Sequence, residues 1–350
     1  MAETVFILGA GASVSAGAPL MGNFIDIAEN VQRKNRQASW SNDFTTIFDL
    51  LSDLNAIYSK NYIDLNNIET LFGLVEMGII INKLGSTSPE EIPKIKNSLV
   101  NVIVKTIEKS MQFKATEDGP FPPADYNQFS ILLKKLIDNR SSTSVITFNY
   151  DIGLDYALMY NRINYDYCLG SNAPHGALKL HKLHGSINWP TNSNGIQPLF
   201  LDNLYQGRIH ISEIRDTPQM NLTISDVLIR RGYSNGPVIV PPTWNKTEYH
   251  GQLANVWKSA AKELSEARNI FIIGYSLPES DAFFKYLIAL GTHGKTRIRR
   301  LRVIDPSTLA EERFRRLFGA GIIDKFLPIN GTFGNSLSSI DGEVKDIIKE

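Results

Sequence analysis

The chain has 350 residues, of which 43% are hydrophobic and 21% charged, and its 36 lysines and arginines balance its 36 aspartates and glutamates. This length suffices for one large α/β domain with insertions or for two domains, and the composition is ordinary for a globular protein. The zero net charge gives no electrostatic argument for binding nucleic acid or a membrane surface, although it does not exclude a local basic patch.

The one cysteine, Cys168, limits the redox and metal chemistry of the chain. It can form no internal disulfide and cannot supply a four-cysteine zinc site. The sequence has no run of about 18 apolar residues that would span a membrane, and its start lacks the basic-then-apolar pattern of a signal peptide. We therefore expect a cytoplasmic protein.

The N-terminal stretch Thr4-Val-Phe-Ile-Leu-Gly-Ala-Gly-Ala-Ser13 predicts a buried strand that breaks into a glycine-rich turn. Such a turn can bring backbone N–H groups against a phosphate, so we expect the first element to hold a nucleotide. It is not the dinucleotide-binding G-x-G-x-x-G, because Val14 stands at the third glycine position. It is not a P-loop either, because no lysine precedes Lys34. A tight strand-to-helix turn without a ligand is the alternative.

The next segments have apolar residues spaced three and four apart, which predicts helices over 20–33, 43–58, 68–84 and 89–114. No strand pattern interrupts the last three, so the segment from residue 40 to 113 forms an expected helical module inserted into the core. The breaker Glu117-Asp-Gly-Pro-Phe-Pro-Pro123 marks the end of this module.

Apolar strands then alternate with amphipathic helices. Helices are predicted over 126–139, 152–160, 252–268, 280–290 and 309–318, and strands over 144–148, 178–183, 238–240, 269–274 and 297–304. This alternation is typical of βαβ units. We therefore predict an α/β fold with a Rossmann-like parallel sheet, helices on both of its faces, the inserted helical module and a second, small insertion.

The predicted boundaries follow from these segments. The Rossmann-like core comprises 1–39, 121–189 and 236–330, the helical module 40–120, the small insertion 190–235, and a C-terminal tail or helix 331–350.

Polar or glycine-rich residues directly follow five predicted strands: Gly9–Ser13, Asn149–Asp151, His184–Ser186, Gly274–Ser276 and Asp305. Because ligands bind outside the carboxyl ends of the strands in an open parallel sheet, these residues would form one site. Structural alternatives exist for several of them. Asn149 or Asp151 could cap the following helix, and Asp305 could start a turn before Pro306.

The two histidines near 178–183 are expected to differ. His184 could be a hydrogen-bonded core residue, but it stands directly before Gly185, where the chain leaves the strand toward the ligand edge. His181 lies three positions earlier, so in a strand it would face the other side. We therefore do not expect the pair to share a metal ion.

Four of these segments resemble, in order, motifs of the sirtuin family. The family's opening NAD-binding motif resembles Gly9-Ala-Gly-Ala-Ser13 together with Ala16-Gly-Ala-Pro19. The family's Thr-Gln-Asn-Ile-Asp segment is similar to Thr147-Phe-Asn-Tyr-Asp151. Leu183-His-Gly-Ser186 resembles the catalytic Leu-His-Gly segment, and Gly274-Tyr-Ser-Leu277 resembles Gly-Thr-Ser-Leu. The resemblance covers roughly residues 1–30, 125–190 and 236–320.

The chain departs from the zinc-dependent sirtuin deacylases at two places. It lacks their two Cys-x-x-Cys pairs, so the 190–235 insertion is expected to be zinc-free, and Leu20-Met-Gly-Asn23 replaces their Asp-Phe-Arg. These departures resemble the divergent bacterial branch that hydrolyses NAD+ in anti-phage defence. The resemblance therefore implies that NAD+ is a substrate, cleaved to nicotinamide and ADP-ribose, and that the chain is an abortive-infection effector.

The resemblance also implies roles for particular residues. Asn149 would orient the nicotinamide ribose or a water, His184 would act as a base, and Asp151 would contact the carboxamide or hold Asn149 in place. The implied NAD+-binding residues are Gly9, Ala10, Gly11, Ala12, Ser13, Thr147, Gly185, Gly274, Ser276 and Asp305.

The resemblance further implies regulation, because an enzyme that depletes NAD+ harms its own cell. Control would come from assembly into a homo-oligomer, or from a partner such as a HerA-type ATPase or an Argonaute-like protein. Two alternatives stay open. One is an NAD-dependent protein deacylase or ADP-ribosyltransferase, and the other is a sensor that binds NAD or ADP-ribose without turnover.

Overall fold

The computed structural model describes residues 3–116, 119–170, 176–201, 219–220, 223–233, 236–240, 252–278, 281–294 and 296–350. Its centre is a seven-stranded sheet in the order β13-β12-β11-β1-β4-β6-β5, in which every neighbouring pair is parallel. The strands are β1 (Thr4–Leu8), β4 (Thr143–Thr147), β5 (Tyr165–Asp166), β6 (Leu178–Lys182), β11 (Asn269–Ile273), β12 (Arg300–Ile304) and β13 (Phe326–Ile329).

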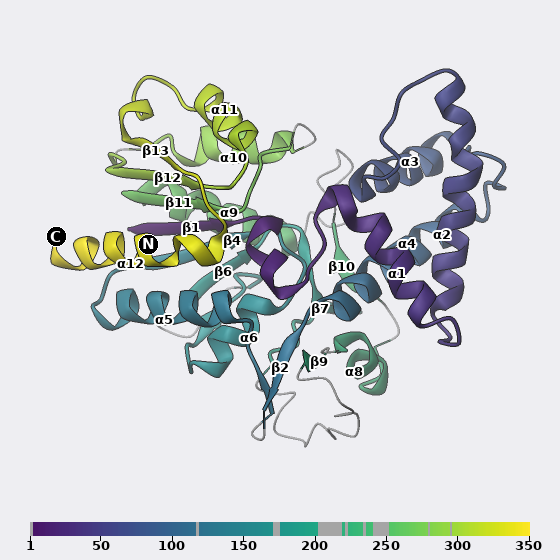
Figure 1. Ribbon diagram of the computed structural model, residues 1–350, viewed down its shortest axis with the longest axis horizontal. Helices are drawn as coiled ribbons and strands as arrows, with labels where there is room; N and C mark the ends of the chain where they lie inside the picture. The colour runs from purple at the N-terminus through teal and green to yellow at the C-terminus, as the bar shows by residue number, and fades with distance from the viewer. Residues whose placement is uncertain are drawn as a thin grey trace.

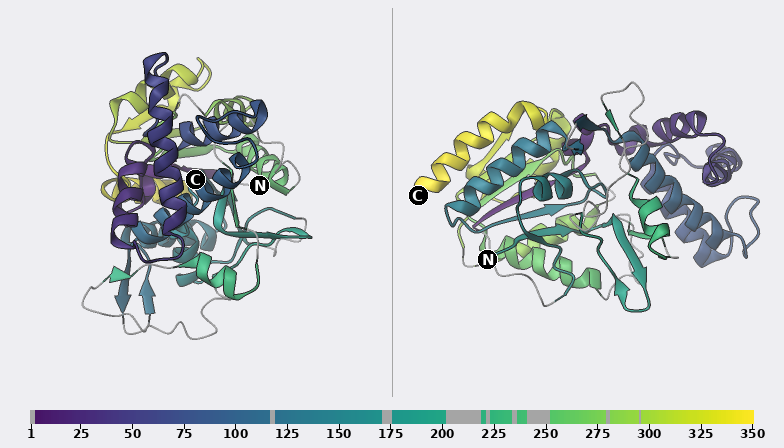
Figure 2. Two further views of the ribbon diagram at one scale, coloured as in Figure 1. Left: turned by 90° about the vertical axis from the view of Figure 1, so that its right-hand side faces the viewer. Right: turned by 90° about the horizontal axis from the view of Figure 1, so that it is seen from below.

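Helices cover both faces of this sheet, as the strand–helix alternation predicted (Figures 1 and 2). On one face lie α5 (Ala124–Asp138) and α12 (Phe333–Lys349), and on the other α9 (Gln252–Glu266) and α10 (Ala282–Gly291). All five residues of the central strand β1 are buried, because it is covered from both sides. Phe6 of β1 stacks on Phe271 and meets Phe129 of α5 edge-on, with ring centroids 5.0 and 5.1 Å apart.

The predicted helices α6 (Gly153–Tyr160) and α11 (Thr308–Leu317) are also present. One predicted strand was assigned to the wrong sheet. The predicted strand 238–240 corresponds to β10 (Pro237–Ile239), which pairs antiparallel with β7 (Gly185–Asn192), and β7 in turn pairs with β8 (Gly195–Ile196). The chain turns out of the main sheet at Gly185, which has φ +84° and lies so close to Val238 that a Cβ would collide with its carbonyl oxygen. Alternating hydrophobicity predicts a strand but not its partner.

The helical module lies beyond the carboxyl ends of the central strands, at the right of Figure 1. It contains α2 (Ser41–Leu54), α3 (Ile68–Ile81) and α4 (Ile92–Ser110), followed by the antiparallel strands β2 (Phe113–Thr116) and β3 (Gly119–Phe121), which the sequence did not predict. The first helix, α1 (Phe24–Lys34), buries Phe24, Ala28 and Val31 in the hydrophobic cluster of this module. The module therefore has a core of its own, separate from the core around the sheet.

The two insertions contact each other. From the 190–235 segment, β9 (Gln219–Met220) pairs with β2, and α8 (Ile224–Arg230) packs beside α4. Lys105 of α4 donates hydrogen bonds to Ser225 Oγ and Asp226 Oδ1, at 2.7 and 2.8 Å. Within the described ranges, no helix combines the length and the apolar character needed to cross a membrane.

Candidate active site

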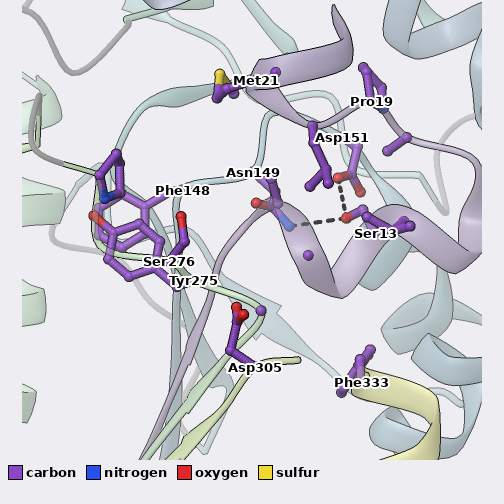
Figure 3. Close-up of a pocket in the computed structure, with 18 of the residues that line it drawn as sticks. Ser13, Pro19, Met21, Phe148, Asn149, Asp151, Tyr275, Ser276, Asp305 and Phe333 are labelled. Atoms are coloured by element: carbon purple, nitrogen blue, oxygen red, sulfur yellow. Dashed lines mark hydrogen bonds between the residues drawn. The ribbon is translucent and has the colours of Figure 1, made fainter. Parts of the chain in front are cut away.

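A cavity of about 600 Å³ opens at the carboxyl ends of the central strands, between the sheet and the helical module (Figure 3). Segments following β1, β4, β6, β11 and β12 line it, and Phe24, Glu69 and Ile107 line it from α1, α3 and α4. From β1 the chain proceeds outward to β4 and β6 on one side, then returns to β11 and β12 on the other. The cavity thus lies at the switch point of the sheet, where ligands bind in doubly wound folds.

The structure brings together most of the residues that the sequence proposed for the site. Those that line the cavity are Ala10, Gly11, Ser13, Asn149, Asp151, His184, Gly274, Ser276 and Asp305. Gly9, Ala12, Thr147 and Gly185 are not among the lining residues. Thr147 instead accepts a hydrogen bond at Oγ1 from the backbone N–H of Asn149, 3.1 Å away.

The turns after β1 and β11 touch, and three glycines allow this approach. A Cβ at Gly9 would lie 2.5 Å from the Gly274 oxygen, and one at Gly11 would lie 2.8 Å from the Gly274 Cα. Gly274 itself has φ +59°, and a Cβ there would collide with the backbone N of Ala12. Glycine is needed at such close approaches because any side chain would force the backbones apart.

Most of the N–H groups of the glycine turn are already used within the protein. Gly9 N–H donates to the Ile273 oxygen at 3.0 Å, Gly11 N–H to the Gly274 oxygen at 2.8 Å, and Ala12 N–H to the Gly9 oxygen at 3.0 Å. These three N–H groups are therefore not available to a phosphate in this conformation. The glycines instead lock the two central turns together.

The side chain of Asn149 is held with its amide nitrogen inward and its oxygen toward the cavity. Nδ2 donates to the Gly9 carbonyl oxygen at 2.9 Å and to Ser13 Oγ at 3.0 Å, with a longer contact of 3.3 Å to Tyr126 OH. A carbonyl oxygen only accepts, so the nitrogen must face it. Oδ1 accepts no hydrogen bond from any described residue, and Figure 3 shows it directed away from Ser13.

A chain of buried hydroxyls joins this amide to Asp151. Ser13 Oγ donates to Asp151 Oδ2 at 2.6 Å and lies 2.7 Å from Tyr126 OH. Ser13 has one hydroxyl proton, so Tyr126 must be the donor in the second bond. Asp151 Oδ1 accepts from the N–H of Gly153, the first residue of α6, at 2.8 Å, although the N-cap position itself is Ile152 and not Asp151 as the capping alternative expected.

His184 and His181 face different surroundings, as their spacing predicted. The ring of His184, which is only 3% exposed, meets Phe148 edge-on at 5.0 Å and lines the cavity. His181 lies against α9, with Nδ1 3.1 Å from the Val145 oxygen and Nε2 2.9 Å from Ser259 Oγ. Burial lowers the pKa of His181 to about 4, so this imidazole is neutral at neutral pH.

At the other end of the cavity, Tyr275 is buried, whereas Ser276 is exposed and Asp305 is partly exposed. Tyr275 stacks on Phe148 with centroids 4.7 Å apart and donates from its hydroxyl to Asp281 Oδ2 at 2.5 Å. Asp305 accepts from the N–H of Ser307 at 2.8 Å, so it both lines the cavity and initiates the turn before α11. Burial raises the pKa of Asp305, and this N–H partly opposes the shift.

The lining as described contains no lysine or arginine, and the described part of the chain contains no cluster of three or more metal-ligating side chains. The same lining carries the carboxyl groups of Glu69, Asp125, Asp151, Asp281 and Asp305. Tyr275 lies in the predicted segment Gly274–Ser276 but was given no role, and Tyr126 was not proposed from the sequence. Tyr126 stands on the apolar face of its helix, where its hydroxyl gave no separate signal.

The fold and the cavity together define a doubly wound α/β protein with a ligand site at its topological switch point. The sequence matches no family model and no curated protein sequence. Among solved structures, the chain is similar to an ADP-ribose complex of a mutant Sir2 homologue, with 12% identity, a TM-score of 0.46, and coverage of 99% of this chain and 93% of the other. It is also similar to a Sir2 homologue–NAD complex (12% identity, TM-score 0.44, 99% and 90% coverage) and to Sir2 bound to an acetylated peptide (15%, 0.38, 97% and 92%).

Proposed function

We propose that this chain is an NAD+ glycohydrolase, which uses water to cleave the nicotinamide–ribose bond and releases nicotinamide, ADP-ribose and a proton. The observation that carries the proposal is the oriented carboxamide of Asn149, whose oxygen faces the same cavity as His184. An acceptor and an imidazole base at one cavity can together orient and deprotonate a water or a ribose hydroxyl. The ordered sirtuin-like motifs in the sequence support the choice of NAD+.

The chemistry needs few groups. Nicotinamide leaves as a neutral molecule from a cationic ring, so no acid has to protonate it. The demand is to stabilise an oxocarbenium-like ribose and to place the nucleophile, as in glycoside hydrolysis. Asn149 Oδ1 would accept a hydrogen bond from the water or ribose hydroxyl, and His184 would take the proton. Asp151, through Ser13, would keep the Asn149 amide in place.

The other end of the cavity would hold the adenosine half. The Asp305 carboxylate, at the end of β12, is suited to accept hydrogen bonds from a ribose hydroxyl pair, and Ser276 lies on the neighbouring turn. Phe148 and Tyr275 provide an aromatic wall between the two ends.

We further propose a role in anti-phage defence, by depletion of NAD+. This rests on the sirtuin-like motifs together with the absence of Cys-x-x-Cys pairs from the sequence. An enzyme that consumes NAD+ must be held inactive until needed, so activation would follow self-assembly or binding of a partner such as a HerA-type ATPase or an Argonaute-like protein.

The proposal is tested by mass analysis of the products formed from NAD+ by the purified chain. We expect equimolar nicotinamide and ADP-ribose whether or not an acylated peptide is present. Asn149→Ala and His184→Ala should each lower turnover by about 10² or more. The exposed residues Asn139 and His293 provide matched controls, and their alanine variants should keep the parent rate.

Other outcomes identify the alternatives. Nicotinamide release only with an acylated peptide would identify a deacylase or transferase. Binding of NAD+ without any product would identify a sensor. Equal turnover by the two cavity variants and the two control variants would refute the assignment of Asn149 and His184.

A further inference from the structure

Lys182, two positions before His184, is a lysine with 1% of its surface exposed at the end of β6. Removing an ammonium group from water costs several kcal/mol, so it needs close partners. Its Nζ donates to the backbone oxygen of Asp151 at 2.5 Å and to Asp155 Oδ2 at 3.0 Å. Because apolar residues of similar size often stabilise a fold as well as a buried ion pair does, folding alone does not explain this lysine.

A buried network fixes Asp155 on the side away from the cavity. Tyr167 OH donates to Asp155 Oδ1, and Tyr167 in turn accepts from Asn188 Nδ2 at 2.8 Å. Asn188 also donates to the backbone oxygen of Leu199 at 2.9 Å. With Asp155 held in this way, the ammonium of Lys182 lies between a fixed carboxylate and the segment that carries Asn149 and Asp151.

The ionisation of Asp151 determines the direction of the hydrogen bonds around Asn149. Its two oxygens accept from Ser13 Oγ and from the Gly153 N–H. A protonated carboxyl would become a donor at one oxygen, and Ser13 could then lose its acceptor and reorient. Ser13 Oγ also accepts from Asn149 Nδ2, so this change would reach the carboxamide that faces the cavity.

We infer that Lys182 is a positioning residue for the proposed reaction. Its ammonium group holds the Asn149–Asp151 segment through the Asp151 backbone oxygen and places a positive charge beside the Asp151 side chain, so that the Asn149 oxygen stays directed into the cavity. This inference rests on the proposed function and adds to it a residue outside the cavity lining.

The electrostatic surroundings of Asp151 agree with this role. Burial raises the pKa of Asp151, the positive charge of Lys182 opposes that rise, and the negative charge of Asp155 adds to it. The charged and titratable groups that act on Asp151 among the described residues include Lys182 from β6, Asp155 from α6 and Tyr126 from α5, and His184 and Asp125 line the same cavity. Lys182 is the one cation among them, so its removal must raise the Asp151 pKa further.

The experiment is the pH–rate profile of nicotinamide release for the parent protein and for Lys182→Met and Lys182→Gln. Both variants remove the charge, and glutamine keeps a side-chain donor for the Asp151 oxygen. We expect the acid limb of the profile to move to higher pH by about 1 to 3 pH units. Turnover should therefore fall about 10-fold or more at acidic pH and recover at alkaline pH. Lys182→Arg keeps the charge and should keep the position of the limb.

Lys179 provides the matched control on the same strand. It pairs with Glu263 at 2.5 Å and makes no contact with Asp151. Lys179→Met should leave the acid limb unchanged. A fall in turnover that is equal at every pH in the Lys182 variants would show a purely structural role and overturn the inference. If Lys182→Met does not fold, the pH–rate profile of Lys182→Gln alone tests the inference.

A failure of the proposed function gives a different result. If the parent protein releases no nicotinamide, the ionisation of Asp151 is measured directly by carbon-13 NMR titration of aspartate-labelled protein, with the signal identified by Asp151→Asn. A higher Asp151 pKa in Lys182→Gln than in the parent would support the electrostatic role of Lys182. An unchanged value would overturn it.

Discussion

The two ends of the cavity are built differently. At the end formed by β1, β4 and β6, the groups proposed for the chemistry are buried and tied to one another: Asn149 is 8% exposed, Asp151 6% and Ser13 1%. At the end formed by β11 and β12, Ser276 is exposed and Asp305 partly so, and each stands on a turn. A fixed network suits groups that must be oriented for a reaction, whereas open turns suit the binding of a ligand that enters and leaves.

This contrast predicts that substitutions at the first end lower kcat and those at the second end raise KM. Substitution of the glycine that joins the two ends should affect both.

The largest effect is expected for Gly274→Ala, at the junction of the two ends. The backbone there has φ +59° and no space for a Cβ, so the turns after β1 and β11 must separate. We expect a loss of about 3 kcal/mol in the free energy of unfolding, measured in urea, together with loss of NAD+ cleavage. Gly319→Ala is the control, because a Cβ there meets nothing within 4 Å. If Gly274→Ala were as stable as that control, the close contact of the turns after β1 and β11 at Gly274 would not be needed for stability.

His181 should affect stability without affecting turnover, because it lies outside both ends. Its pKa is lowered to about 4 in the folded protein, whereas the unfolded chain has the ordinary value of 6.5. Between these two pH values the unfolded chain therefore binds one more proton than the folded protein does. Its contribution to stability is present above pH 6.5 and is lost as the pH falls toward 4. Between pH 7.5 and pH 5 this loss should be about 2 kcal/mol.

Denaturant unfolding at the two pH values measures this loss. In His181→Gln the pH dependence should shrink by that amount, while kcat at pH 7.5 stays close to that of the parent protein. An unchanged pH dependence would contradict the buried, neutral state of His181.

Asp305→Asn tests the end of the cavity formed by β11 and β12. Removing the charge weakens the proposed hydrogen bonds to a ribose hydroxyl pair, so KM for NAD+ should rise about 10-fold while kcat stays within about twofold. Steady-state kinetics gives both values. A fall in kcat with no change in KM would place Asp305 with the other end and remove the contrast.

The smallest effect is expected for Tyr126→Phe, which removes one hydroxyl from the buried network at the end of the cavity formed by β1, β4 and β6. The loss of its hydrogen bond to Ser13 should cost about 1 kcal/mol in stability and lower kcat by about 5-fold, with KM unchanged. Kinetics and urea unfolding of the same preparation separate the two effects. If KM rises instead, the hydroxyl acts on binding and not on the orientation of Asn149.

Much of the fold could be predicted from the sequence because its elements have clear local periodicity. The apolar strands that form β1, β4, β6, β11 and β12 and the amphipathic helices between them predict a parallel sheet. A parallel sheet places all carboxyl ends at one edge, which is why Asn149, His184 and Asp305 could be assigned to one region. The partner of β10 could not be predicted, because it depends on the turn at Gly185.

What the sequence determined by itself is where polar groups follow buried strands, since that depends on neighbouring residues. What only the tertiary structure decided is how these groups are connected. Ser13 meets Tyr126 across 113 positions and Asp151 across 138, and Lys182 meets Asp155 inside the protein. The N–H groups expected to hold a phosphate are in part consumed by the turn after β11. Such contacts depend on which segments pack together, and no local pattern in the sequence encodes that choice.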